Sequence, residues 1–342
     1  NHVLHLDETS LVVQAQAGLS ALELERLLRP RGLTLGAYSP AALNASLGGV
    51  LSVRTPGKSS PRHGAFEDAV LGVSAVLPNG KIVHTRVAPR RATGPDLMRV
   101  LFGAEGMFGV MTSVVLRIHR WPETQLLCAF RLASLASAIS ATQAALREGA
   151  RPAGVRIYDA EDARAHLGAD AAQGEEAILV AATVGPPELA SIDRDLFARA
   201  AQKLEGKDLG PGPAEIWWRR RAGHKIDDLE PELPSVEVTA PAERLPAVHA
   251  ALVSAVRAFS PPHTSACAHV SRFAPDGACL FATLFRNGRA DKSDGLRAVA
   301  EHAAKGAGAF LLGERDPSWQ PYVADLQALL DPEHVLRPAV LL

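Results

Sequence analysis

The sequence has few cysteines and no long apolar run. Its cysteines are Cys128, Cys267 and Cys279. An odd number of widely spaced cysteines argues against a disulfide framework and against a zinc site, and it indicates a reducing, cytoplasmic setting. No cluster has metal-ligand spacing, so no metal is expected. An uninterrupted apolar span of roughly 20 residues is also missing, and no transmembrane helix is predicted.

The chain also lacks an excess of charge of either sign. Its 36 basic and 37 acidic side chains give a formal net charge of −1. Without a basic excess, neither a nucleic acid nor an anionic membrane is indicated as a partner. The 342 residues, 47% of them hydrophobic, suffice for one large or two medium domains with apolar cores. We therefore expect a globular protein.

Strand and turn signals dominate the first third of the chain. Because it begins with Asn1 and enters a strand-like run at once, we expect the natural protein to have residues upstream. A capping box at Ser20 and Glu23 predicts a helix that ends near Leu28. A short helix is expected from Pro95 to Phe102. The expected strands are Val3–Leu6, Leu11–Gln16, Ala69–Leu77, Lys81–Thr85 and Val110–Ile118.

After Trp121 the pattern changes to strands alternating with amphipathic helices. It predicts an α+β domain, an antiparallel sheet that helices cover on one face. A Gly/Pro-rich loop is expected at Lys207–Pro213, and a last helix at Trp319–Leu330. We place domain boundaries at 1–120, 121–315 and 316–342, with the last segment returning to the first domain. The other expected strands are 126–132, 154–158, 177–184, 236–239, 265–273 and 278–285. The other expected helices are 134–148, 160–167, 187–204, 242–259 and one that ends near 305.

Three glycine-containing segments are candidates for chemistry. The first is Ser46-Leu47-Gly48-Gly49 with Ser52 close behind, where exposed amides could cradle a phosphate. The second surrounds Gly64 and leads to the hairpin turn at Pro78-Asn79-Gly80. The third runs from Thr93-Gly94 to Gly109-Val110 and places glycines around Glu105. Backbone groups in such a loop can touch a planar ring. Taken singly, each is also typical of an ordinary turn.

Together, in this order and spacing, the three segments resemble the FAD-linked oxidase family of the vanillyl-alcohol-oxidase or para-cresol-methylhydroxylase (PCMH) type. Within this family, the sequences of these motifs are most similar to those of the alkyl-dihydroxyacetone-phosphate synthases. The resemblance is strong to about residue 120 and looser beyond. It implies the second half of a PCMH-type FAD-binding domain and a substrate-binding cap domain.

The resemblance implies FAD as cofactor and a small-molecule substrate. A lipid-like character of this substrate and a homodimeric assembly are further implications of the resemblance. The family's earlier pyrophosphate loop would lie upstream of Asn1. His63 is a candidate for flavin attachment by proximity alone. Arg156 matches a substrate-phosphate arginine, although a strand residue facing solvent is the alternative. The implied FAD contacts are Pro40, Ser46, Leu47, Gly48, Gly49, Ser52, Arg54, Thr55, Gly64, Glu105, Gly106, Gly109 and Val110.

The catalytic groups of the synthases do not carry over. The family tyrosine falls near Phe273-Ala274, where neither side chain can exchange a proton. The family histidines fall at Phe310, Leu311 and Leu312. A second phosphate arginine falls near Ile226–Leu229, where carboxylates stand.

Three hypotheses therefore stay open. The chain is a flavoenzyme with altered substrate chemistry, a catalytically degenerate paralogue that acts as a binding or assembly subunit, or a genuine synthase whose catalytic groups lie elsewhere in the sequence. The first, an FAD-dependent oxidoreductase, is slightly favoured because the flavin itself performs the difficult step.

Overall fold

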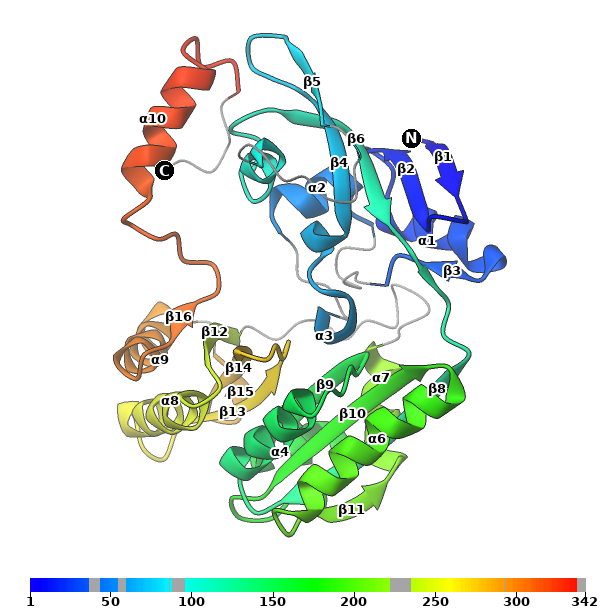
Figure 1. The fold of residues 1–342 in the computed structure, drawn as a ribbon. Helices are drawn as coiled ribbons and strands as arrows, with labels where there is room; N and C mark the ends of the chain where they lie inside the picture. The colour runs from blue at the N-terminus through cyan, green and yellow to red at the C-terminus, as the bar shows by residue number, and fades with distance from the viewer. Residues whose placement is uncertain are drawn as a thin grey trace. The chain divides into compact units, whose positions relative to one another are not determined.

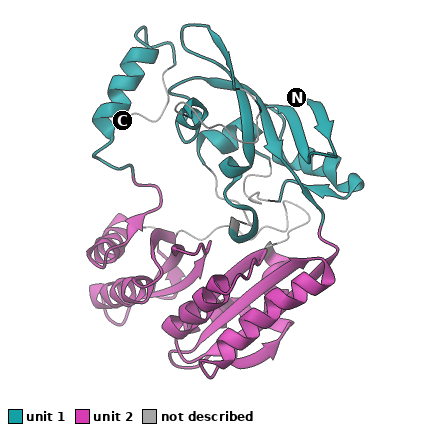
Figure 2. Ribbon diagram, in the orientation of Figure 1, with its two compact units in different colours: residues 1–121, 315–342 teal, residues 122–314 magenta. Residues whose placement is uncertain are grey.

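The computed structural model describes residues 1–36, 44–54, 60–85, 87, 96–221, 235–291 and 293–336. The chain divides into two compact units (Figure 2). Unit 1 comprises Asn1–Trp121 and Arg315–Leu342, and unit 2 comprises Pro122–Glu314. None of the helices in the described part combines the length and the apolar character needed to span a bilayer.

Unit 1 is built on an antiparallel sheet whose order is β1-β2-β6-β4-β5 within the described residues (Figure 1). A separate pair joins β3 (Leu33–Thr34) to β7 (His119–Arg120). The strands expected in this part of the sequence are confirmed to within one residue at each end. They are β1 (Val3–Asp7), β2 (Val12–Gln16), β4 (Val70–Val76), β5 (Ile82–His84) and β6 (Val110–Arg117).

The capping box predicted at the first helix is confirmed. Ser20 Oγ accepts the Glu23 amide, and Glu23 Oε2 accepts the Ser20 amide, both at 3.2 Å. The helix expected over 95–102 is instead a 3₁₀-helix, η3. The helical elements of unit 1 are α1 (Ala21–Leu28), η1 (Arg29–Arg31), α2 (Leu47–Ser52), α3 (Ser60–His63), η2 (Phe66–Ala69), η3 (Leu97–Leu101) and α10 (Gln320–Leu330).

The core of unit 1 forms between the sheet and the helices α1 and α2. Leu24 of α1 and Leu51 of α2 are fully buried, as are Val114 and Leu116 on β6. The C-terminal helix α10 packs against this same core through its half-buried apolar side chains, which are Val323, Leu326 and Leu330.

Unit 2 is built on a larger antiparallel sheet with the order β11-β8-β10-β9-β13-β14-β12-β16, and β15 pairs with β14. Its strands are β8 (Thr124–Leu132), β9 (Gly154–Tyr158), β10 (Ala177–Gly185), β11 (Lys207–Gly210), β12 (Ser235–Pro241), β13 (Thr264–Ser271), β14 (Gly277–Arg286), β15 (Arg289–Ala290) and β16 (Phe310–Leu311). The α+β fold predicted from the sequence is confirmed.

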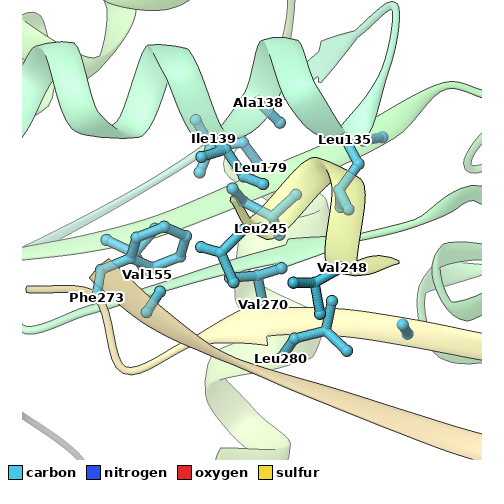
Figure 3. Close-up of a cluster of buried hydrophobic side chains, with 14 of the residues drawn as sticks. Leu135, Ala138, Ile139, Val155, Leu179, Leu245, Val248, Val270, Phe273 and Leu280 are labelled. Carbon is cyan, nitrogen blue, oxygen red and sulfur yellow. The ribbon is translucent and has the colours of Figure 1, made fainter. Parts of the chain in front are cut away.

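Four helices cover one face of this sheet. They are α4 (Leu135–Arg147), α6 (Pro187–Gln202), α8 (Leu245–Phe259) and α9 (Asp294–Gly306). Figure 3 shows how side chains of α4 and α8, among them Ile139 and Val248, meet Val155, Leu179 and Leu280 from the strands. These side chains form one continuous apolar core.

The prediction that helices cover only one face is wrong for the half of the sheet around β10. Every residue of β10 is buried, which requires cover on both sides. The second cover consists of α5 (Ala160–Leu167) and α7 (Gly212–Arg221), which bury Ala163 and Trp217. The loop expected at 207–213 is therefore strand β11 and the start of α7, and Trp217 is a core residue.

Candidate functional site

The double glycine of the first segment lies in helix α2. Ser46 caps this helix, and its Oγ accepts the Gly49 amide at 3.1 Å. The amides of Leu47 and Gly48 donate to Leu19 O and Ala17 O at 2.9 and 2.8 Å. The expected cradle of free amides is therefore not formed by these residues. Gly48 is needed for packing, since a Cβ there would lie 3.2 Å from Ala17 Cβ.

The loop around Glu105 is attached directly to the end of α2. The Gly103 amide donates to Leu51 O and the Glu105 amide donates to Ser52 O, both at 3.0 Å. The first and third glycine segments thus form one continuous backbone structure. Arg54, also predicted to contact the cofactor, lies in the turn after α2 and is exposed, and a Cβ on Gly103 would contact its side chain.

Glu105 and Gly106 both have a left-handed backbone. Their φ angles are 49° and 89°, and a Cβ on Gly106 would meet no atom within 4 Å. The backbone at Gly106 therefore presents an open surface that a flat ring can approach. Gly109 directly precedes β6, whose first residue, Val110, is an exposed apolar side chain next to this loop.

Gly64 lies in the turn that leads into η2. The amide of the next residue, Ala65, donates to Asp68 Oδ2 at 3.0 Å. Beside this turn, the rings of His63 and His119 lie with their centroids 4.0 Å apart and their planes tilted by 35°. Burial, followed by the charges of His119 and Arg62, lowers the pKa of His63 to about 3. The ring pair was not anticipated from the sequence, because its two members lie on distant segments.

Two of the predicted contacts, Pro40 and Thr55, lie outside the described residues, as do Thr93, Gly94 and the segment Ile226–Leu229. The other predicted FAD contacts all belong to unit 1. Arg156 belongs to unit 2.

One face of the second half of the unit 2 sheet carries polar side chains, several of them half-buried. Along β12, Val236 and Val238 are buried in the core, whereas Glu237 and Thr239 point to the opposite face and are half-buried. We call this surface the polar face. Strand pairing adds to it Arg156 from β9, His269 and Ser271 from β13, and Cys279 and Phe281 from β14.

Two arginines on the polar face have buried nitrogens without a hydrogen-bond partner among the described residues. They are Nε of Arg156 and Nη1 of Arg272. Arg156 lies opposite Ser271 in the strand pairing, and Arg272 lies over the Phe281 ring with its Cζ 4.7 Å from the centroid. Unsatisfied buried guanidinium groups are costly unless an anion completes their hydrogen bonding.

The polar face also carries a network centred on Asp162 of α5, which is 2% exposed. His166 Nδ1 lies 3.0 Å from Oδ1, and His269 Nδ1 lies 3.3 Å from Oδ2. Burial alone would raise the pKa of Asp162, but contacts with His166 and His269 hold it well below its usual value. The contact with Asp162 raises the pKa of His166. Sequence reasoning missed this network.

The positions aligned with the family's catalytic residues lie at the margin of the sheet. Ala274 is exposed in the turn between β13 and β14, where its carbonyl accepts Gln143 Nε2 at 3.2 Å. Phe310 and Leu311 form the edge strand β16, and Leu312 follows it. Cys128, Cys267 and Cys279 are buried and free. Within the described ranges, no group of three or more His, Cys, Asp or Glu side chains is arranged to hold a metal ion.

Family models match both units. Residues 1–86 match the model described as FAD binding domain, and residues 121–311 match the model described as FAD linked oxidases, C-terminal domain.

Curated relatives share about one third of the matched residues. The Uncharacterized FAD-linked oxidoreductase YgcU of Escherichia coli (strain K12) is 32% identical over 193 residues, covering 56% of this chain and 40% of that protein. Alkyldihydroxyacetonephosphate synthase of Caenorhabditis elegans is 31% identical over 157 residues, which are 46% of this chain and 26% of that protein. D-lactate dehydrogenase [cytochrome], mitochondrial, of Arabidopsis thaliana is 31% identical over 163 residues, which are 47% of this chain and 28% of that protein. The chain thus spans less than half the length of these relatives.

Solved structures share the fold. An alkyldihydroxyacetonephosphate synthase matches with a TM-score of 0.81 and 21% identity, covering 99% of this chain and 66% of that chain. A p-cresol methylhydroxylase matches with a TM-score of 0.69 and 14% identity, covering 98% of this chain and 77% of that chain. At these identities the likeness shows the fold alone.

Proposed function

This chain belongs to the FAD-linked oxidase family, and from that premise we propose that it is a flavin-dependent enzyme acting on a small anionic substrate. Unit 1 would hold the flavin, and the polar face of unit 2 would bind the substrate. The observation that carries the proposal is the pair of backbone hydrogen bonds from Gly103 and Glu105 to Leu51 and Ser52. They fix the two predicted cofactor segments as one structure.

The residues of unit 1 fit a flat cofactor. Gly106 offers backbone without a side chain and with open space above it, and the Glu105 amide is already fixed by Ser52 O. Ser52, Glu105, Gly106 and Val110 would hold the ring, while the amides of α2 remain bonded within the protein. When bound, the flavin supplies an acceptor for an electron pair withdrawn from the substrate.

The residues of the polar face favour an anionic substrate. Arg156 and Arg272 each leave a buried nitrogen without a partner among the described residues. A carboxylate or a phosphate monoester supplies the oxygens that such guanidinium groups bind best. Their role would be to orient the substrate and to exclude water from its charged end.

A second candidate is the alkyl transfer performed by the synthases of this family. It is supported by the 31% identity to the Caenorhabditis elegans enzyme. Ala274 weighs against it, because the resemblance places the proton-exchanging tyrosine at this position, and alanine cannot exchange a proton.

The decisive experiment is the visible spectrum of the full-length protein during titration with FAD, followed by turnover assays. We expect a yellow protein whose flavin is reduced by a small anionic substrate, with D-lactate as the first probe. A protein that takes up no FAD would reject the proposal and favour a binding or assembly role. Consumption of acyl-dihydroxyacetone phosphate together with a fatty alcohol would favour the second candidate instead.

A further inference from the structure

Asp162 brings two histidines and a cysteine of unit 2 to one buried carboxylate. Oδ1 faces His166 Nδ1 at 3.0 Å and accepts the Cys267 thiol at 3.3 Å. Burial raises the pKa of Cys267, so this sulfur stays protonated and donates. Oδ2 accepts no aligned hydrogen bond among the described residues, and His269 Nδ1 lies 3.3 Å from it.

A neighbouring carboxylate fixes the position of Asp162. Asp159 caps helix α5, since its Oδ1 accepts the Asp162 amide at 2.8 Å. Its Oδ2 accepts the Ala268 amide of β13 at 2.7 Å and faces His249 Nε2 at 3.1 Å. The first turn of α5 is therefore anchored to the strand that carries His269, and Asp162 is held beneath that histidine.

The surroundings of His269 restrain its ring on the polar face. The ring stacks on Phe281 at 5.1 Å with an interplanar angle of 12°, and its side chain is 21% exposed. The titratable groups that face it are Arg156 and Tyr158 from β9 and Asp162 and His166 from α5. His269 is thus a restrained, partly exposed imidazole beside Arg156, whose Nε has no hydrogen-bond partner among the described residues.

We propose that His269 exchanges a proton with the substrate and that Asp162 is the positioning residue that fixes its tautomer. This role rests on the proposed function, because it requires the substrate to bind on the polar face. The Nδ1 proton would point to Asp162 Oδ2, which leaves Nε2 as the base. Hydrogen bonds of catalytic groups often become aligned only when the substrate binds.

The proton transfer is balanced within named groups. The O–H bond of a substrate hydroxyl breaks and leaves its electron pair on oxygen, while an N–H bond forms at His269 Nε2. The imidazolium is then countered by Asp162, and the alkoxide by Arg156.

Charge at Arg156 links substrate binding to the strength of this base. Burial, and next the charge of Arg156, lower the pKa of His269 to about 4, against the opposing effect of Asp162. An anion bound to Arg156 offsets its charge and raises the pKa of His269. The histidine would become a stronger base only when the anionic end of the substrate is in place.

Nitrogen-15 NMR of histidine-labelled full-length protein tests the pair without requiring the substrate. We expect His269 in the Nδ1–H tautomer, and a further fall of its pKa with a mixture of tautomers in Asp162→Asn. Inorganic phosphate should raise the pKa of His269 in the wild type and leave it unchanged in Arg156→Gln. A tautomer and pKa that do not respond to Asp162→Asn would overturn the positioning role.

His263 provides the control, because it is an exposed histidine of unit 2 whose Nδ1 lies 2.9 Å from Asn287 Oδ1, outside the Asp162 network. With D-lactate, or with whichever probe the wild-type protein turns over, His269→Gln should lower kcat about 100-fold or more while the flavin spectrum stays unchanged. His263→Gln should keep wild-type turnover. Wild-type turnover by His269→Gln with flavin bound would overturn this inference alone, whereas a wild-type protein without flavin would reject the proposed function and this role together.

Discussion

Arg315 donates a hydrogen bond of 3.2 Å from Nη2 to Oε2 of Glu105, although 210 residues separate them in the chain. Both side chains are about one third exposed, at 35% and 34%. The contact ties the segment that begins unit 1's C-terminal part to the loop proposed to hold the flavin. Glu105 has a left-handed backbone with φ of 49°, so its conformation depends on such external restraints.

Replacing Arg315 with Gln should weaken FAD binding modestly. A partly exposed ion pair contributes about 0.2 to 1 kcal/mol, so the Kd for FAD should rise at most about fivefold. Fluorescence titration of flavin measures this change. Arg297→Gln, which removes an ion pair with Glu301 on α9, is the control and should leave the Kd unchanged. Equal effects of the two variants would show that the Arg315 contact has no special connection with the flavin.

Replacing Gly106 with Val should abolish FAD uptake, because a side chain would fill the open surface where the ring is proposed to lie. The matched control is Gly80→Val in the turn between β4 and β5. Both glycines have positive φ, 89° and 77°, and a Cβ on either would meet nothing within 4 Å. Each variant therefore carries a similar backbone strain of about 1 to 2 kcal/mol. If both variants retain FAD to the same extent, the ring does not lie at Gly106.

Local contacts made part of this structure predictable from the sequence. The capping box of Ser20 and Glu23 forms within four consecutive residues, so the sequence alone suffices to predict it. Strands such as β6 follow from their apolar patterns. Helix α7 was missed because the glycines and prolines of 207–213 favour a loop, whereas burial of Trp217 against the sheet stabilises a helix.

The sites depend more strongly on contacts between distant residues. The glycine segments around Gly48 and Glu105 could be recognised individually, but the hydrogen bonds that join them could not. Asp162 stood in a predicted helix, and nothing in its neighbourhood indicated burial beneath His269, which lies on a strand more than 100 residues away. Only strand pairing brings Arg156 and Ser271 together.

Replacing Gly48 with Ala should destabilise unit 1. The new Cβ would lie 3.2 Å from Ala17 Cβ and 3.4 Å from Ala17 O. Overpacking of this kind typically costs about 1 to 3 kcal/mol of unfolding free energy. Ala17→Gly in the same chain removes the nearest atom and should restore part of the loss. Urea unfolding of the single and double variants measures it, and a double variant no more stable than Gly48→Ala would place the strain elsewhere.

The neighbouring histidines His63 and His119 of unit 1 should make this unit sensitive to acid. The pKa of His63 is about 3 in the folded protein, against an ordinary value of 6.5. Between these two pH values, the unfolded chain therefore binds a proton at His63, whereas the folded protein does not. The stabilisation is fully present above pH 6.5 and is lost progressively as the pH falls towards 3. Over that range the loss is on the order of a few kcal/mol.

His63→Gln should remove this sensitivity, because glutamine has no proton to gain between these pH values. Urea midpoints of the wild type should fall between pH 7 and pH 4, and those of His63→Gln should fall less. His263→Gln is the control, since His263 is an exposed histidine of unit 2 and its loss should leave the pH dependence of unit 1 unchanged. The urea midpoint of unit 1 can be followed by the fluorescence of Trp121, which belongs to this unit. If His63→Gln and the wild type lose stability in parallel, the acid response comes from other groups, and burial of the His63–His119 pair does not control it.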